Sequence, residues 1–513
     1  MAAHGEKLSA NLLGIDVGTG GTRALLIDEN GRVLASATAD HRPFASPQTG
    51  WAEQEPQDWW RACCQAVRQL VSESGIVASK ISAVGFSGQM HGAILLDAEG
   101  TPLRPALIWC DQRTAAEAAE LTLRIGAARL IELTCNPALT NFTLTKLLWV
   151  RKHEPQVFDK FRMLQLPKDY VRWRLTGEYA MDMADASGTL LLDVANRRWS
   201  KEMANATGIA LSVLPKLFES SEVCGAISKE GAAATGLAAG TPVVTGAGDQ
   251  AAGAVGLGVV APGAVHATIG TSGVVFASTA SPKMDPRGRL HTFCHAVPGR
   301  WHVMGVTQAA GLSLRWFRDH FGSSSSGNRD PYDVLTDEAA SVPPGSDGVL
   351  WAPYLMGERT PHLDPDARAA LVGLTANHRR AHVVRAILEG VAFSLRDSFS
   401  IFDELQIPVT NIRLGGGGAR SPLWRQIQAD VYSQKVEIVE AEEGAAYGAA
   451  ILAGVGAKVW STVDDGCRSV VHVKTTVEAD PESAQIMQRQ YSKYRRVYPA
   501  LQSIRDSYSS QTA

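Results

Sequence analysis

The sequence contains no long run of apolar residues, and its first residues, MAAHGEKLSA, contain no hydrophobic segment like that of a signal peptide. A membrane-spanning helix needs about 20 consecutive, mostly apolar residues, so neither a membrane span nor export is expected. An excess of one charge is lacking too, because 49 lysines and arginines stand against 52 aspartates and glutamates without a long block of one sign. The sequence therefore predicts a cytoplasmic protein that binds neither membranes nor nucleic acids.

Cysteine is scarce and badly spaced for metal binding. The 7 cysteines contain no Cys-x-x-Cys pair, so zinc ribbons and a disulfide framework are not expected, and buried free thiols are the default state. The P-loop motif G-x-x-x-x-G-K-[ST], the H-R-D and D-F-G motifs of protein kinases and the hydrolase motif G-x-S-x-G are absent as well. A bound nucleotide would have to be held in another way.

The chain is long and rich in glycine. A chain of 513 residues exceeds what one hydrophobic core usually supports, so two domains or more are expected. Apolar residues make up 45% of the chain and charged residues 20%, as in ordinary globular proteins, and 48 glycines indicate many tight turns. Strand-like and helix-like segments alternate in both halves, which predicts an α/β fold in each.

Two segments share one plan of an apolar strand, a glycine turn and a second strand. They cover residues 12–27 and 265–278, and their turns at 18–21 and 270–273 align with an offset of 252 residues, nearly half the chain. The repeat predicts two domains of similar build. Both turns also offer backbone N–H groups that can cradle phosphate oxygens.

Three further segments carry clear secondary-structure signals. Apolar residues at helical spacing predict helices over residues 56–71 and 380–405. Residues 411–432 have the pattern of a strand, a glycine loop and a helix, with Ser421 as the N-cap and Pro422 in the first turn.

Two aspartates stand beside glycine turns. Asp249 lies in TGAGDQAAGAVG, almost entirely among glycines and alanines, and Asp16 lies in GIDVGT. Asp249 is either the N-cap of a following helix or a base that takes a hydroxyl proton where the helix dipole favours phosphate. Asp16 either caps its turn or meets a magnesium ion, directly or through water.

The segment SGQMHG, residues 87–92, follows an apolar strand and places Gln89, Met90 and His91 between glycines. A lone histidine is more often structural than catalytic, and a methionine is ordinarily part of a core. Polar side chains at the end of a strand are nevertheless well placed to bind a polyhydroxylated ligand.

Taken together, these segments resemble the FGGY carbohydrate kinases, and within that family the bacterial-type xylulokinases. The resemblance runs from about Leu12 to about Gly454. The segments that carry it are GIDVGTGGTR (14–23), WAEQEPQDWW (51–60), GQMHGAILLD (88–97), TKLLWVRKHEP (145–155), LPKDYVRWRLTGEYAMDMADASGT (166–189), GAGDQAAGAVGLG (246–258), GTSGVVF (270–276), PYLMGERTPH (353–362) and GGGGARSPLWRQIQAD (415–430).

The resemblance implies two actin-like, ribonuclease-H-like domains with a ligand cleft between them. They would cover residues 1–255 and 256–500, followed by a flexible tail over 501–513. The implied reaction is the ATP-dependent phosphorylation of D-xylulose to D-xylulose 5-phosphate, with ATP and Mg²⁺ as cofactors. Asp249 matches the catalytic base and Asp16 the carboxylate near the metal. An aspartate with an ordinary pKa of about 4 is a weak base, yet it suffices when the alcohol becomes acidic only in a loose transition state.

The resemblance also assigns binding residues. Met90 and His91 match the pair that contacts the sugar, and Gln250 matches the residue beside the base. Asn141 should lie near the sugar pocket, where relatives usually have a small or aromatic residue, and Gln250 replaces an asparagine found in some xylulokinases. The nucleotide side would consist of Thr19, Gly20, Gly21 and Arg23 in the first phosphate loop, Gly270 and Thr271 in the second, Gly311 beside the nucleotide, and Gly416, Gly417 and Ser421 near the adenosine.

Two alternatives stay open at the level of the sequence. One is another sugar or polyol kinase of the same family, such as a ribulokinase; a glycerol kinase fits less well, because those enzymes carry an Arg-Glu pair where this chain has Met90 and His91. The other is a non-catalytic, actin-like sensor of nucleotide or sugar, which would have no need of Asp249 as a proton acceptor. The expected partner is a ketopentose, and both a monomer and a homodimer are compatible with the sequence.

Overall fold

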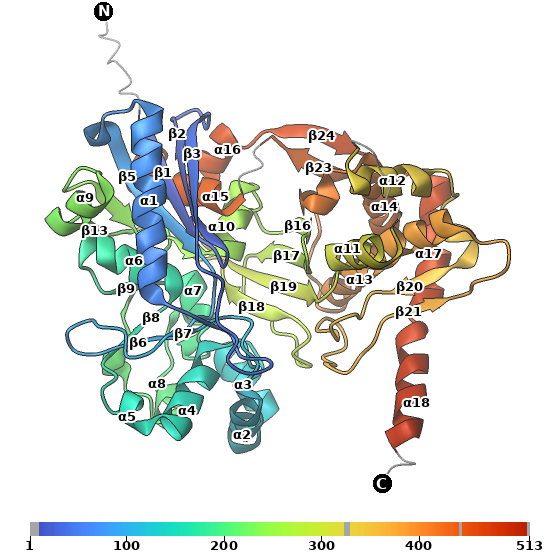
Figure 1. The fold of residues 1–513 in the computed structure, drawn as a ribbon, viewed down its shortest axis with the longest axis horizontal. Helices are drawn as coiled ribbons and strands as arrows, with labels where there is room; N and C mark the ends of the chain where they lie inside the picture. Colours follow the sequence, from blue (N-terminus) through green and yellow to red (C-terminus); the bar gives the residue numbers. More distant parts are fainter. Residues whose placement is uncertain (1–9, 323–328, 441–443, 510–513) are drawn as a thin grey trace, which may run out of the picture.

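The computed structural model describes residues 10–322, 329–440 and 444–509 (Figure 1). Its framework consists of two seven-stranded sheets, each part of a separate α/β unit. The first sheet, in spatial order, contains β13 (Val223–Ala226), β14 (Pro242–Val244), β5 (Ile81–Gly88), β1 (Asn11–Val17), β2 (Gly21–Ile27) and β3 (Val33–Asp40), and β15 (Ala247–Gly248) pairs with β5. The second contains β18 (His291–Cys294), β19 (Trp301–Thr307), β17 (Gly273–Thr279), β16 (Ala264–Ile269), β22 (Asn411–Gly416), β23 (Val436–Val439) and β24 (Val473–Val477).

The predicted internal repeat is confirmed by the pairing of the strands. In the first sheet, β1 and β2 form an antiparallel hairpin and β5 runs parallel to β1. In the second sheet, β16 and β17 form the corresponding hairpin and β22 runs parallel to β16. The glycine turns of the two hairpins therefore occupy corresponding places in two similar units.

The helices pack on these sheets where their apolar faces predict it. Helix α1 (Pro56–Ser74) contacts β2 and β3, and α13 (Arg380–Glu404) lies in the core of the second unit. The helix after the glycine loop is α14 (Pro422–Tyr432), and the Ser421 side chain accepts a hydrogen bond from the Trp424 N–H, as its N-cap position predicts. All three predicted helices are thus present.

One helix from the C-terminal part of the chain packs on the first sheet. Helix α15 (Gly444–Gly456) packs against β1 and β5 on the face opposite α1 and also crosses α10 (Asp249–Gly256), as Figure 1 shows. The approach is close because glycines line it: a Cβ at Gly14 would lie 1.9 Å from the Ala446 carbonyl oxygen, and one at Gly448 would lie 1.8 Å from that of Ala252. The chain thus leaves the second sheet after β23, packs backbone to backbone on the first unit as α15, and returns to the second sheet at β24.

A smaller group of elements covers the lower edge of the first unit in Figure 1. It includes α2 (Ala115–Ile125), α3 (Ala127–Thr134) and α4 (Thr143–His153), whereas α6 (Pro167–Thr176) packs against α1 and β5, and α7 (Met183–Ser187) packs against β15 and β18. Helix α4 is buried along almost its whole length and brings residues 141–146 next to the end of β5. This group therefore supplies one wall of the region that follows β5.

Residues 501–509, where the sequence predicts the start of a flexible tail, lie in helix α18 (Val497–Ser509), and residues 510–513 lie outside the described range. Tyr498 and Arg505 of this helix both bind the Asp364 carboxylate. The cysteine prediction is confirmed in its main point, since all seven thiols are free; five are buried, and Cys64 and Cys110 are half-buried. In the described part of the chain, no helix is long and apolar enough to cross a membrane.

Candidate active site

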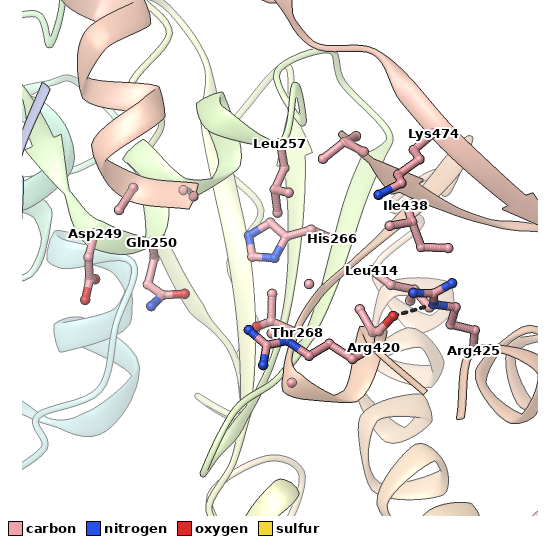
Figure 2. Close-up of a pocket in the computed structure, with 18 of the residues that line it drawn as sticks. Asp249, Gln250, Leu257, His266, Thr268, Leu414, Arg420, Arg425, Ile438 and Lys474 are labelled. Atoms are coloured by element: carbon pink, nitrogen blue, oxygen red, sulfur yellow. Dashed lines mark hydrogen bonds between the residues drawn. The ribbon is translucent and has the colours of Figure 1, made fainter. Parts of the chain in front are cut away.

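Two adjoining cavities lie at the strand ends of the two sheets. The larger, of about 530 Å³, is lined from the first unit by Asp16, Asp249 and Gln250 and from the second by Gly416 and Gly417. Figure 2 shows Asp249 and Gln250 on one side of it and Arg420 and Arg425 on the other. The smaller, of about 280 Å³, shares Gly417 and Arg420 with the first. Groups from both halves of the chain thus face common space.

Asp249 is placed by two neighbouring strands. It follows β15 directly, and β15 pairs in parallel with the end of β5, where Gly248 lies opposite Gly88. Asp249 is the first residue of α10, and the N-cap position belongs to Gly248, so the capping interpretation of Asp249 does not hold. A carboxylate at the first turn of a helix is close to the positive end of its dipole, a place that also attracts phosphate.

Burial raises the pKa of Asp249 to about 7, and the negative charge of Asp16 adds to the shift. The expectation of an ordinary value near 4 is therefore wrong. The sequence could not reveal this, because the second carboxylate comes from a different strand, more than two hundred residues earlier in the chain. A carboxylate with a pKa near neutrality is a much stronger base than an exposed one and remains largely ionised at slightly alkaline pH.

Asp16 lies near the end of β1, opposite Arg23 on β2 and Ser87 on β5. Burial raises the pKa of its carboxyl group against the opposite effects of the nearby Ser87 hydroxyl and the Arg23 charge, and its buried Oδ1 oxygen has no donor within normal hydrogen-bond geometry among the described residues. A buried carboxylate oxygen without a donor is an unfavourable arrangement unless a cation or water binds it. This observation fits the predicted approach of a magnesium ion.

The pair Met90 and His91 follows β5 and lies next to Asp249. Met90 fills the space beside Gly248, where an added Cβ would come within 2.7 Å of the methionine Cγ. His91 is buried, and burial lowers its pKa to about 3, so the ring is neutral. Its Nδ1 lies 3.0 Å from the Gly188 carbonyl oxygen and must donate to it, which leaves Nε2 as a hydrogen-bond acceptor.

The other two residues predicted to contact the sugar differ in their surroundings. Asn141 is buried before α4, and its side-chain Oδ1 has no partner among the described residues. Gln250 is half-buried and lines the larger cavity beside Asp249. Met90, His91, Asn141 and Asp249 are thus brought together around the ends of β5 and β15 from segments far apart in the sequence.

The first glycine turn is fixed by side chains from other segments. The Gln89 amide donates to the Gly18 carbonyl oxygen and to Gln54, the Gln54 amide donates to the Thr19 carbonyl oxygen, and the Trp109 indole donates to the Thr19 hydroxyl. Space is open beside Gly20, whereas a Cβ at Gly21 would press on β3. The backbone of the turn is therefore held firmly while its outer side stays accessible.

None of the four residues predicted for the first phosphate loop, Thr19, Gly20, Gly21 and Arg23, is among the described residues that line the two cavities. The Arg23 Nε and Nη2 donate to the Ser36 hydroxyl on β3. The charge of Arg23 still acts on Asp16, whose pKa it lowers against the effect of burial. The structure therefore favours an electrostatic role for Arg23, in which its positive charge stabilises the ionised carboxylate of Asp16.

The second glycine turn is joined to a helix. Gly270 and Thr271 accept hydrogen bonds from the backbone at the start of α11 (Gly311–Phe321), including Gly311 N to Gly270 O at 2.8 Å. A Cβ at Gly311 would lie 2.4 Å from the Gly270 oxygen, so only glycine allows this contact. All three residues line the smaller cavity.

The last group of predicted residues lies beside that turn. Ile269 of β16 is paired with Gly416 of β22, which has a φ of 72° and carries the chain close over the Ile269 carbonyl. Gly417 lines both cavities, and Ser421 lines the smaller one together with Tyr332. This cavity has a mixed polar and apolar wall, which suits a nucleoside.

Sequence reasoning overlooked several buried charged groups around the site. Lys146 in α4 is completely buried and donates to the backbone beside the sugar-side residues. Lys168 is equally buried and forms ion pairs with Asp169, Asp182 and Asp185. A signal existed for Lys146, since it is the only charged residue in the otherwise uncharged stretch FTLTKLLWV. No sequence pattern identified its acceptors.

Comparison with known families decides which kinases the chain is related to. Residues 11–256 match the N-terminal domain of the FGGY family of carbohydrate kinases, and residues 265–457 match its C-terminal domain. The chain belongs to this family. The implied two-domain, actin-like and ribonuclease-H-like architecture is thereby confirmed, and so is the interpretation as a sugar kinase.

Individual relatives of this FGGY kinase are xylulose kinases. The chain is 41% identical to the xylulose kinase of Escherichia coli (strain K12) over 87% of this chain and 90% of that protein. It is 37% identical to the xylulose kinase of Bacillus subtilis (strain 168) over 95% of this chain and 96% of that one. The crystal structure of the xylulose kinase from Rhodospirillum rubrum matches with a TM-score of 0.89 at 30% identity, covering 96% of this chain and 99% of that one.

Membership of a kinase family implies ATP as the phosphoryl donor and raises the question of its metal. Among the described residues, no group of three or more His, Cys, Asp or Glu side chains could hold an ion. Mg²⁺ typically binds through one or two carboxylates, with phosphate oxygens and waters completing its coordination. Asp16, with its unpaired buried oxygen, fits that role.

Proposed function

We propose that this FGGY kinase transfers the γ-phosphoryl group of ATP to the terminal hydroxyl of D-xylulose, forming D-xylulose 5-phosphate. The observation that carries the proposal is the position of Asp249, a carboxylate of raised pKa in the cavity shared by both halves of the chain. The xylulose kinases among its relatives support the choice of sugar.

The nucleotide and the sugar would bind at neighbouring places that meet at Asp249. The nucleoside of ATP would occupy the smaller cavity beside Tyr332 and Ser421, with its phosphates over the turn at Gly270 and the N-terminus of α11. The sugar would lie against Met90, with a hydroxyl donating to Nε2 of His91. This arrangement directs the terminal hydroxyl toward Asp249 and the phosphates toward the same carboxylate from the opposite side.

Phosphoryl transfer then requires little covalent help from the protein. The chain positions the acceptor oxygen in line with the γ-phosphorus, and the O–P bond to the sugar forms as the bond to ADP breaks. Asp249 accepts the proton of the hydroxyl, and the backbone N–H groups of the glycine turns stabilise phosphate charge. A magnesium ion held near Asp16 would neutralise charge on the phosphates. Asn141 and Gln250 would bind further hydroxyls of the sugar.

The experiment is an assay of ADP release over D-xylulose, D-ribulose, glycerol and gluconate, with the position of the phosphate determined by NMR. We expect the highest kcat/KM for D-xylulose and a phosphate on its terminal carbon. A clear preference for D-ribulose would favour the ribulokinase-like alternative. Absence of ADP release with every acceptor, despite nucleotide binding, would leave the protein a sensor.

The matched test of the mechanism is Asp249→Asn. Its kcat should fall by about 10²-fold or more, the usual loss for a general base, while binding of sugar and nucleotide changes little. Asp366→Asn, which neutralises an exposed aspartate, serves as the control and should behave like the wild type. A kcat for Asp249→Asn close to that of the wild type would remove this residue from the mechanism.

A further inference from the structure

Lys146 is an unusual residue in an unusual place. Its side chain has no exposed surface, and most of the surrounding core is apolar. Among the described residues it forms no ion pair: the nearest carboxylate that acts on it, that of Asp111, is already bound by Arg113. Burial lowers the pKa of Lys146 to about 7, because the charged form of the amine is costly in this core, and an apolar side chain would pack there at less cost.

The Lys146 ammonium group instead binds two backbone carbonyls. Its Nζ lies 2.9 Å from the oxygen of His91 and 2.5 Å from that of Asn141. These two residues come from different segments, one following β5 and the other preceding α4. Lys146 therefore ties together two backbone segments that both carry predicted sugar-binding side chains.

His91 needs such a restraint because its backbone is strained. Its φ is 67°, in the left-handed region that costs a non-glycine residue free energy unless the surroundings hold it there. Besides Lys146, the Thr143 hydroxyl donates to the same carbonyl at 3.2 Å. The ring is fixed separately, by Nδ1 donating to the Gly188 carbonyl and by packing against Phe142 and Phe293.

We propose that Lys146 is a positioning residue for sugar binding: it holds the strained His91 backbone and the Asn141 backbone at a fixed separation, so that both side chains meet the sugar hydroxyls. The proposal rests on the proposed sugar kinase function, in which His91 contacts the sugar. It assigns no contact between Lys146 and the sugar. The two hydrogen bonds from Nζ to carbonyls explain why a lysine is present where an apolar residue would pack better.

The test is Lys146→Met, which keeps the length and apolar part of the side chain and removes its donors. We expect kcat/KM for D-xylulose to fall by about 10-fold or more through a raised KM, the usual range for buried acceptors left unpaired. The KM for ATP should stay within about 2-fold of the wild type, because the nucleotide side is not touched. Thr143→Val removes the weaker donor to the same carbonyl and should show a smaller change of the same kind.

The matched control for a purely structural role is Leu121→Ala, which destabilises the same apolar cluster from α2. It should lower the melting temperature without raising the KM for the sugar. A crystal structure of Lys146→Met, or of Thr143→Val if the first variant does not fold, adds a direct measurement, since φ of His91 should leave the left-handed region. An unchanged sugar KM and an unchanged His91 backbone would overturn the proposal.

Failure of the proposed function has a different signature. If the wild type phosphorylates no ketopentose, the reaction itself is wrongly assigned, whatever Lys146 does. If the wild type is active and Lys146→Met, like Leu121→Ala, lowers the melting temperature without raising the KM for the sugar, Lys146 merely stabilises the fold.

Discussion

At the scale of single residues, the site depends on two carboxylates that come close only in the folded chain. Asp16 and Asp249 are both half-buried and line the larger cavity, and burial raises the pKa of each. Like charges at close range disfavour double ionisation, which is why the negative charge of Asp16 contributes to the raised pKa of Asp249. The raised value makes Asp249 a better proton acceptor, and it also makes activity depend on pH.

The predicted pH dependence follows from the protonation state of the base. Asp249 must be ionised to accept a proton, so kcat/KM for the sugar should fall as the pH drops below about 7, and should level off above it. Steady-state kinetics at a series of pH values and saturating ATP measure this acidic fall in kcat/KM. A profile that is flat down to pH 5 would show that Asp249 does not act as the base with the raised pKa.

Stability should respond with the opposite sign. Because the pKa of Asp249 is higher in the folded than in the unfolded chain, the unfolded chain ionises first as the pH rises. This carboxyl group therefore destabilises the fold increasingly between about pH 4, its unfolded value, and pH 7. Asp249→Asn should consequently melt at a higher temperature than the wild type at pH 8 and show little difference at pH 4. This comparison serves as the control that separates loss of the base from loss of the fold.

At the scale of elements, the position of Asp249 depends on how α10 crosses α15. The crossing is so close that a Cβ at Gly448 would lie 1.8 Å from the Ala252 carbonyl oxygen of α10. Gly448→Ala should therefore push the two helices apart and destabilise the protein by about 1–3 kcal/mol, as overpacking does, although alanine is the better helix former. The kcat should fall as well, since α10 begins at Asp249.

Gly253→Ala is the matched control, because it adds the same methyl group to α10 at a position where a Cβ meets nothing within 4 Å. It should leave stability unchanged or raise it by up to about 1 kcal/mol through helix propensity. Thermal and denaturant unfolding of both variants measure the difference. Equal stability of the two variants would contradict the close crossing.

The elements also show what a sequence can and cannot predict. The hairpins at β1–β2 and β16–β17 and the helices α1 and α13 were predictable, because strand alternation, turn glycines and helical spacing are local signals. The packing of α15 on the first sheet could not be predicted, since no local sequence signal marks Gly448 as the place where α15 crosses α10. The raised pKa of Asp249 and the two acceptors of Lys146 were equally beyond reach, because both depend on contacts between segments far apart in the chain.

At the scale of the whole molecule, catalysis requires the two units to act together. The sugar-side residues Met90 and His91 belong to the first unit, and the turn at Gly270 and the loop at Gly416 belong to the second. The larger cavity receives walls from both and has a volume of about 530 Å³, more than a pentulose and a γ-phosphate need together. Water would share that space and could accept the phosphoryl group instead of the sugar.

We therefore expect D-xylulose together with a non-hydrolysable ATP analogue to bring the two units closer and to expel water from the larger cavity. Small-angle scattering of the wild type should show a smaller radius of gyration with both ligands than with either alone. Asp249→Asn should close to the same extent, because it keeps both binding surfaces and loses only the base. His91→Ala should require more sugar to reach the same closure, since it lacks the acceptor at Nε2. A radius of gyration that does not change with both ligands at saturation would mean that the cavity already has its reactive shape, and that water is excluded by the substrates themselves.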